Sequence, residues 1–210
     1  MQGKLITFEG SDGAGKTTAL KRVVAILKPK LGRRLELTRE PGGNPIAEQI
    51  RQIILDPNNT QMDARAEVLL YAAARRQHVV QTLRPALAQG RIILCDRYVD
   101  SSLAYQGGGR KLGLTAVRKL NDYATRGLNP DLTFYFRIPF KLGLKRIKFH
   151  RKNKIDRLDA ETLSFHQRVA KAYLKIARAN PDRVRVIDSA RSTDQVVHQV
   201  LRILKSEFKL

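Results

Sequence analysis

The 210-residue sequence is poor in several residue types, with no tryptophan, two methionines and one cysteine, Cys95. A single cysteine excludes a disulfide within the chain and is typical of a reducing compartment, so we expect a cytoplasmic protein. No apolar run reaches the roughly 18–20 residues of a membrane-spanning helix, and we expect no membrane segment. The first residues lack a basic stretch followed by an apolar one, so we expect no secretory signal.

Aspartate and glutamate are also scarce: 19 of them stand against 40 lysines and arginines, which gives a net charge of +21. Residues 106–210 hold 24 of the 40 basic side chains. Such a surplus is typical of proteins that bind polyanions, namely nucleic acids, anionic membranes or phosphorylated metabolites. The sequence has no recognised nucleic-acid motif and no stripe of aromatic residues interleaved with the basic ones: only Phe140 and Phe149 occur within residues 137–160. We therefore expect no specific nucleic-acid partner, and at most a non-specific, salt-dependent binding to polyanions.

Hydrophobic residues make up 42% of the chain and charged residues 28%, which excludes a disordered or fibrous protein. The length predicts one domain over residues 1–210. Short apolar runs alternate with stretches of helical spacing, and this predicts an α/β fold in which helices cover both faces of a parallel sheet. We expect strands over residues 5–9, 35–39, 92–95, 132–138 and 184–187. We expect helices over residues 16–31, 46–56, 64–88 with a kink or end at Pro85, 114–123, 142–149, 160–179 and 196–204.

The strongest motif is GSDGAGKT over residues 10–17, which matches the G-x-x-x-x-G-K-[ST] phosphate-binding loop between a strand and a helix. Its glycines tolerate positive φ, so successive backbone N–H groups can point at phosphate oxygens beside a helix N-terminus. Lys16 would place a positive charge on the β- and γ-phosphates, and the Thr17 hydroxyl would bind Mg²⁺. We expect the nucleotide to contact Gly10, Ser11, Asp12, Gly13, Ala14, Gly15, Lys16, Thr17 and Thr18.

Asp96 is the second candidate, because it follows the apolar strand residues 92–95. In an open α/β sheet the carboxyl ends of the strands face the ligand crevice. Asp96 could therefore reach the metal through its water shell, or it could cap a helix or turn. Cys95 fits a small core residue better than a nucleophile.

Three arginines form a third candidate group: Arg39 ends a predicted strand, Arg75 lies in the long helix, and Arg97 follows Asp96. A planar guanidinium group can donate two parallel hydrogen bonds to two oxygens of one phosphate. Taken singly, each arginine is best explained as a surface or ion-paired residue. Converging on one crevice, the three would clamp a phosphoryl acceptor.

Taken together, the motifs resemble the thymidylate kinase family, bacterial type, over nearly the whole chain. The resemblance rests on the loop at residues 9–18, TREPGG at 38–43, LLYAAARRQH at 69–78, CDRYVDSSLAYQ at 95–106, LNPDL at 128–132 and DRLD at 156–159. It implies a three-layer P-loop NTPase fold with a five-stranded parallel sheet and a short lid over about residues 142–158. It also implies transfer of the γ-phosphoryl group of ATP to dTMP, with Mg²⁺, to give dTDP for dTTP biosynthesis in a homodimer.

The same resemblance implies roles on the phosphate side of the acceptor. Asp12 would approach its sugar and phosphate, and Arg39 and Arg75 would position the phosphate. Arg97 would neutralise charge during transfer. Glu40 belongs to the same acceptor-binding group.

For the nucleoside, the resemblance implies that Tyr71 stacks on thymine, while Arg75, Ser102 and Gln106 contact the base edge or the phosphate. Tyr105 would crowd the sugar 2′ carbon and favour deoxyribose.

The lid would donate a catalytic arginine, with Arg151 as the candidate and Arg146 and Arg157 as alternatives. The chain departs from the family habit at Ala74, Arg137 and Lys141. Two other functions remain open at this point: a related P-loop kinase with another nucleotide acceptor, and a basic nucleic-acid-binding NTPase.

The long helix over residues 64–88 is a candidate dimer contact, because Val68, Val79 and Leu83 make it more apolar than one face requires. Alternatively, these residues complete the core of one subunit.

Overall fold

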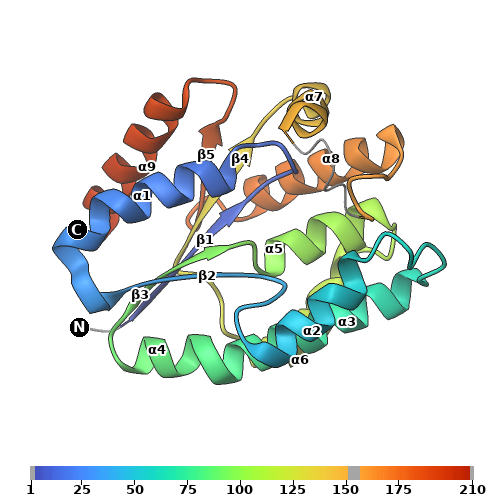
Figure 1. The fold of residues 1–210 in the computed structure, drawn as a ribbon, viewed down its shortest axis with the longest axis horizontal. Coiled ribbons are helices and arrows are strands. Elements are labelled where there is room, and N and C mark those ends of the chain that lie inside the picture. Colours follow the sequence, from blue (N-terminus) through green and yellow to red (C-terminus); the bar gives the residue numbers. More distant parts are fainter. Residues whose placement is uncertain (1–2, 151–156, 209–210) are drawn as a thin grey trace.

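The computed structural model describes residues 3–150 and 157–208. Within them, one parallel sheet has the strand order β2-β3-β1-β4-β5 (Figure 1). The strands are β1 (Lys4–Glu9), β2 (Leu35–Arg39), β3 (Ile92–Asp96), β4 (Leu132–Arg137) and β5 (Val184–Asp188). The predicted five-stranded parallel sheet is therefore confirmed. β1 lies at its centre, which puts the loop that follows Glu9 in the middle of the carboxyl edge.

Helices cover both faces of this sheet, as the sequence predicts. Side chains of β1 alternate between two cores: Ile6 and Phe8 face α1 (Lys16–Leu31) and α9 (Thr193–Phe208), and Leu5 faces the opposite layer. That layer contains α2 (Pro45–Leu55), α3 (Ala64–His78), α4 (Arg84–Ala88), α5 (Val99–Ser102), α6 (Leu114–Thr125) and α8 (Leu163–Ala179). α7 (Phe140–His150) follows β4 and lies beside the loop after β1 (Figure 1).

The helix predicted over residues 64–88 runs to its expected end but is not uniform. A π-helical turn, Val79–Leu83, joins α3 to α4, and Pro85 lies in the first turn of α4. Proline has no N–H to donate to a carbonyl one turn earlier, so a widened turn replaces the regular ladder here. Of the two alternatives predicted at Pro85, a kink or an end, the helix does not end there; instead its regular hydrogen bonding is interrupted by the π-helical turn just before Pro85.

Residues 99–109 form α5 and a second π-helical segment, Leu103–Gly109, where the sequence predicted no helix. The glycines at 107–109 disfavour helix formation, but tertiary packing requires them. A Cβ at Gly108 would lie 2.5 Å from the Ala172 Cβ, and one at Gly109 would lie 2.6 Å from the Phe165 ring. The close approach of α8 therefore requires glycine at positions 108 and 109, even though glycine lowers the intrinsic helix propensity of this segment.

Several ends differ from prediction by a few residues. α8 begins at Leu163 and not near residue 160, because the Thr162 side chain caps it by accepting from the Phe165 N–H. Among residues 3–150 and 157–208, no helix combines the length and apolar character of a membrane span.

Candidate active site

A cavity of about 900 Å³ opens at the carboxyl edge of the sheet, beside the loop that joins β1 to α1. It brings together most of the candidate residues, including all three arginines. Of the candidates, the following line it: Asp12, Gly13, Ala14, Gly15, Lys16, Thr17, Thr18, Arg39, Glu40, Tyr71, Arg75, Asp96, Arg97, Ser102, Tyr105, Gln106 and Arg146. Gly10 and Ser11 lie at the start of the loop, behind this lining. The convergence makes an acceptor clamp geometrically feasible.

The loop has the backbone conformation that its glycines allow, with φ of 139° at Gly10, 72° at Gly13 and 77° at Gly15. Lys16 is folded over the loop: its Nζ donates to the carbonyl oxygens of Gly10 at 2.8 Å and Ser11 at 3.0 Å. Burial, together with the nearby charge of Arg97, lowers the pKa of Lys16 to about 8 against the opposing effect of the neighbouring carboxylates. The ammonium group is therefore partly desolvated in this structure, and bound phosphate oxygens would stabilise its charged form.

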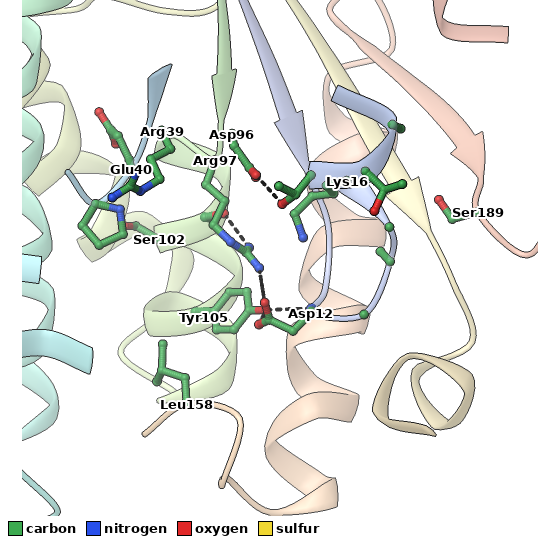
Figure 2. Close-up of a pocket in the computed structure, with 18 of the residues that line it drawn as sticks. Asp12, Lys16, Arg39, Glu40, Asp96, Arg97, Ser102, Tyr105, Leu158 and Ser189 are labelled. Atoms are coloured by element: carbon green, nitrogen blue, oxygen red, sulfur yellow. Dashed lines mark hydrogen bonds and ion pairs between the residues drawn. The ribbon is translucent and has the colours of Figure 1, made fainter. Parts of the chain in front are cut away.

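Thr17 and Asp96 meet at the start of α1, where the Thr17 hydroxyl donates to Asp96 Oδ2 at 2.7 Å (Figure 2). Mg²⁺ prefers oxygen ligands and usually takes only one or two protein groups, with phosphates and waters completing its shell. Among the described residues, no group of three or more histidine, cysteine, aspartate or glutamate side chains could hold a metal ion by itself. The hydroxyl and carboxylate pair fits Mg²⁺ bound together with a nucleotide.

Arg97 occupies the middle of the site with a left-handed backbone, φ 71°, which is unusual for a residue with a side chain. Its NH2 donates to Asp12 Oδ1 at 2.7 Å, and its guanidinium lies over the Tyr105 ring (Figure 2). The Tyr105 hydroxyl donates to the other Asp12 oxygen. Burial opposes the charge of Arg97, but Asp12 raises its pKa above the ordinary value, so the guanidinium stays positive.

Glu9 is a site residue that the sequence analysis missed. Its carboxylate is fully buried and accepts from the Tyr98 N–H at 2.7 Å, the Ser101 hydroxyl at 2.6 Å and the Tyr173 hydroxyl at 3.1 Å. Arg97 NH1 donates to the same two hydroxyls. Burial raises the pKa of Glu9 to about 7, with Asp100 adding to the rise. The signal was available, since Glu9 ends an apolar strand just as Asp96 does.

Arg75 also lines the cavity, and every nitrogen of its guanidinium donates a hydrogen bond. Nε binds Glu40 Oε2 at 2.7 Å, NH1 binds Ser102 Oγ at 3.0 Å and also Asn121, and NH2 binds the Tyr98 carbonyl at 3.0 Å. Arg75 is 2% exposed. It is therefore a rigid donor that presents a fixed edge to the cavity.

Glu40 and Arg39 differ although they are neighbours. Glu40 is buried and also bound to His78 Nδ1 at 2.8 Å, so it holds Arg75 and does not project into solvent. Arg39 lies at the exposed rim, where a single nitrogen, NH2, donates to both carboxylate oxygens of Glu48, each at 2.9 Å. Arg39 can exchange this pair for a phosphate, because an exposed ion pair is worth little.

The lid candidates have three different outcomes. Arg151 lies outside the described residues. Arg146, on α7, lines the cavity while its NH1 donates to the Ser189 carbonyl at 3.1 Å. Arg157 is 8% exposed and binds Glu67 at 2.6 Å and the Ile54 carbonyl at 3.1 Å, away from the cavity lining.

The residues that depart from the family habit are not among those that line the cavity. Ala74 is buried in α3, and both Arg137 and Lys141 are exposed. Two interpretations were open for Val68, Val79 and Leu83, a dimer contact or the core of one subunit. All three are buried within this subunit and complete its core, as the second interpretation has it.

Comparison with known proteins gives a consistent result. The family model described as Thymidylate kinase matches residues 8–200. The thymidylate kinase of Latilactobacillus sakei is 58% identical over 204 residues, which are 97% of this chain and 95% of that protein. That of Lactiplantibacillus plantarum is 58% identical over 207 residues, covering 99% and 94%. The crystal structure of thymidylate kinase from Ehrlichia chaffeensis superposes with a TM-score of 0.81 at 31% identity, covering 97% of this chain and all of that one.

Proposed function

This chain belongs to the thymidylate kinase family and phosphorylates dTMP to dTDP, and we propose that ATP and dTMP meet in the cavity beside the β1–α1 loop. A related kinase with another acceptor, or a nucleic-acid-binding NTPase, is not favoured. The observation that carries the proposal is the convergence of Lys16 with Arg39, Arg75 and Arg97 on one cavity. Four positive side chains around one space fit two phosphorylated reactants that repel each other.

On the donor side, the loop amides and Lys16 bind the β- and γ-phosphates of ATP. Thr17 and Asp96 would hold Mg²⁺, which neutralises phosphate charge when it is bound. The 2.7 Å contact between their side chains supports this assignment.

On the acceptor side, Tyr71 stacks on the thymine ring while Arg75 and Gln106 bind its edge. Tyr71 and Arg75 are one helical turn apart on α3, so both reach the same part of the cavity. Ser102 helps to hold Arg75 in place. Tyr105 lies against the sugar and favours deoxyribose.

The acceptor phosphate itself attacks the γ-phosphorus, so no protein nucleophile is needed. Arg39 at the rim orients that phosphate. Arg97, fixed by Asp12, stabilises the charge shared by the two reactants. An arginine of the lid completes the site and excludes water; Arg151 is our first candidate and Arg146 the alternative.

Tyr71→Ala tests the placement of the two substrates. We expect calorimetry to show dTMP affinity falling by roughly tenfold or more, as for the loss of one aromatic stacking partner of a base, with ATP affinity unchanged. Arg65→Ala, at an exposed position on the same helix, is the matched control. An equal loss for both ligands would contradict the stacking role.

We also propose a cytoplasmic homodimer. Cys95 is a buried free thiol, as in a reducing compartment. Aliphatic side chains remain exposed on the neighbouring helices α2 and α3, with Ile46 46%, Ile53 49% and Leu69 56% exposed. A charge of +21 on each subunit opposes pairing at low salt. Sedimentation at two salt concentrations tests this, and a monomer in both would refute the dimer.

A further inference from the structure

Glu67, on the first turn of α3, is a fully buried carboxylate behind the wall of the cavity. It accepts a hydrogen bond from Gln106 Nε2 at 2.8 Å, from Arg110 NH2 at 3.0 Å and from Arg157 NH2 at 2.6 Å. No proposed catalytic step uses it. Burying a carboxylate together with two guanidinium groups carries a large desolvation penalty. We therefore ask which neighbouring side chain this cluster holds in position.

The charge of Glu67 is held by its neighbours. Burial alone raises the pKa of this carboxyl, but the hydrogen bonds from Arg110, Gln106 and Arg157 outweigh burial and hold the pKa below its usual value. Glu67 is therefore ionised at any pH near neutrality. An ionised carboxylate accepts hydrogen bonds and donates none.

Because Glu67 can only accept hydrogen bonds, it restricts the orientation of the Gln106 side chain, which is 1% exposed and lines the cavity. A carboxamide has nearly the same shape when its oxygen and nitrogen are exchanged, so a glutamine without such a neighbour could present a donor or an acceptor. Against Glu67, only the nitrogen can face the carboxylate. Within residues 3–150 and 157–208 no group donates to the Gln106 oxygen, which leaves this oxygen for a ligand.

We propose that Glu67 is a specificity-determining positioning residue, which locks the Gln106 carboxamide with its oxygen toward the base. A pyrimidine whose N3 carries a hydrogen, as thymine does, then donates to that oxygen. Cytosine has a lone pair at N3, so two acceptors would face each other in a buried site, which costs far more than losing one contact. The inference rests on the proposed placement of the base against Gln106.

The test compares kcat/KM for dTMP and for 5-methyl-dCMP, which keeps the 5-methyl group but differs at N3 and C4. We expect Glu67→Gln to lower the dTMP preference at least about tenfold, because a neutral amide at position 67 lets the Gln106 amide rotate. Glu161→Gln is the matched control, since it removes another acidic partner of Arg110 and leaves Gln106 untouched. A folded Glu67→Gln enzyme with the wild-type preference overturns the inference.

A charge exchange covers the case in which Glu67→Gln does not fold. In the double variant Glu67→Gln/Gln106→Glu, the amide at 67 donates to a carboxylate at 106, which still accepts from N3–H. A restored preference for dTMP supports the proposal, and a lost preference overturns it.

Gln106→Leu separates this inference from the proposed function. If its KM for dTMP equals that of the wild type, the base does not lie against Gln106, and both proposals fail. If its KM rises while Glu67→Gln keeps the wild-type preference, the placement stands and only the role of Glu67 is refuted.

Discussion

Burial of Lys16 makes ATP affinity depend on pH in a range where ATP itself no longer titrates, since the last phosphate pKa is about 6. The pKa of Lys16 is about 8, and phosphate oxygens around Nζ favour its charged form. If only the charged lysine binds, the affinity falls about eightfold between pH 7.5 and pH 9. At pH 9 about nine-tenths of a proton is then taken up for each ATP bound. The direction is fixed: affinity is full below the pKa and is lost above it.

Calorimetry of Mg-ATP binding at pH 9, in two buffers with different protonation enthalpies, measures that proton directly. Lys16→Met should bind ATP weakly and take up no proton. Lys21→Met, at an exposed position on the same helix, should behave like the wild type. Equal affinity at both pH values, together with impaired binding by Lys16→Met, would show that Lys16 binds phosphate without the proposed desolvation.

Three further outcomes are expected. Arg183→Ala removes both hydrogen bonds to the buried Asp100 carboxylate and should lower the free energy of unfolding by about 3–5 kcal/mol in urea titrations; a loss below about 1 kcal/mol would contradict this. Glu9 binds a proton more tightly in the folded than in the unfolded chain, so wild-type stability should fall as pH rises from about 4.5 to about 7. In thermal melts, the stability of Glu9→Gln should not fall with pH in this range. If it falls as it does in the wild type, a group other than Glu9 causes the pH dependence. Gly13→Ala adds a Cβ that overlaps the backbone of α7 and should abolish ATP binding in calorimetry, whereas Gly15→Ala meets no atom within 4 Å and should weaken it only moderately; equal effects would refute the steric argument.

The sheet could be predicted because its signals are local. Ile92–Cys95 is a continuous apolar run and Leu5–Phe8 is apolar except for Thr7, as expected of strands buried on both faces. The segment 99–109 could not be predicted, because its three glycines are explained only by contact with α8, some 60 residues later. The π-helical turn before Pro85 likewise needs the core that Val79 and Leu83 fill.

The site divides in the same way. Loop residues were found from spacing within eight positions, and Arg39 and Arg97 from their places at the ends of strands. Arg75 was chosen from within the long predicted helix. The partners that fix them, such as Asn121 for Arg75, lie tens of residues away, and no local pattern marks such a partner. The residue Glu67 joins Gln106 and Arg157 across 39 and 90 positions, so its role appears only after folding.

The widened turn at Leu103–Gly109 also constrains the length of the chain. It carries Tyr105 and Gln106, and its hydrogen bonds span one residue more than those of an α-helix. Deleting one residue there would permit ordinary α-helical hydrogen bonds. It would also rotate the residues that follow the deletion by about 100° around the helix axis. The number of residues in this stretch is therefore constrained as strictly as the identity of its glycines.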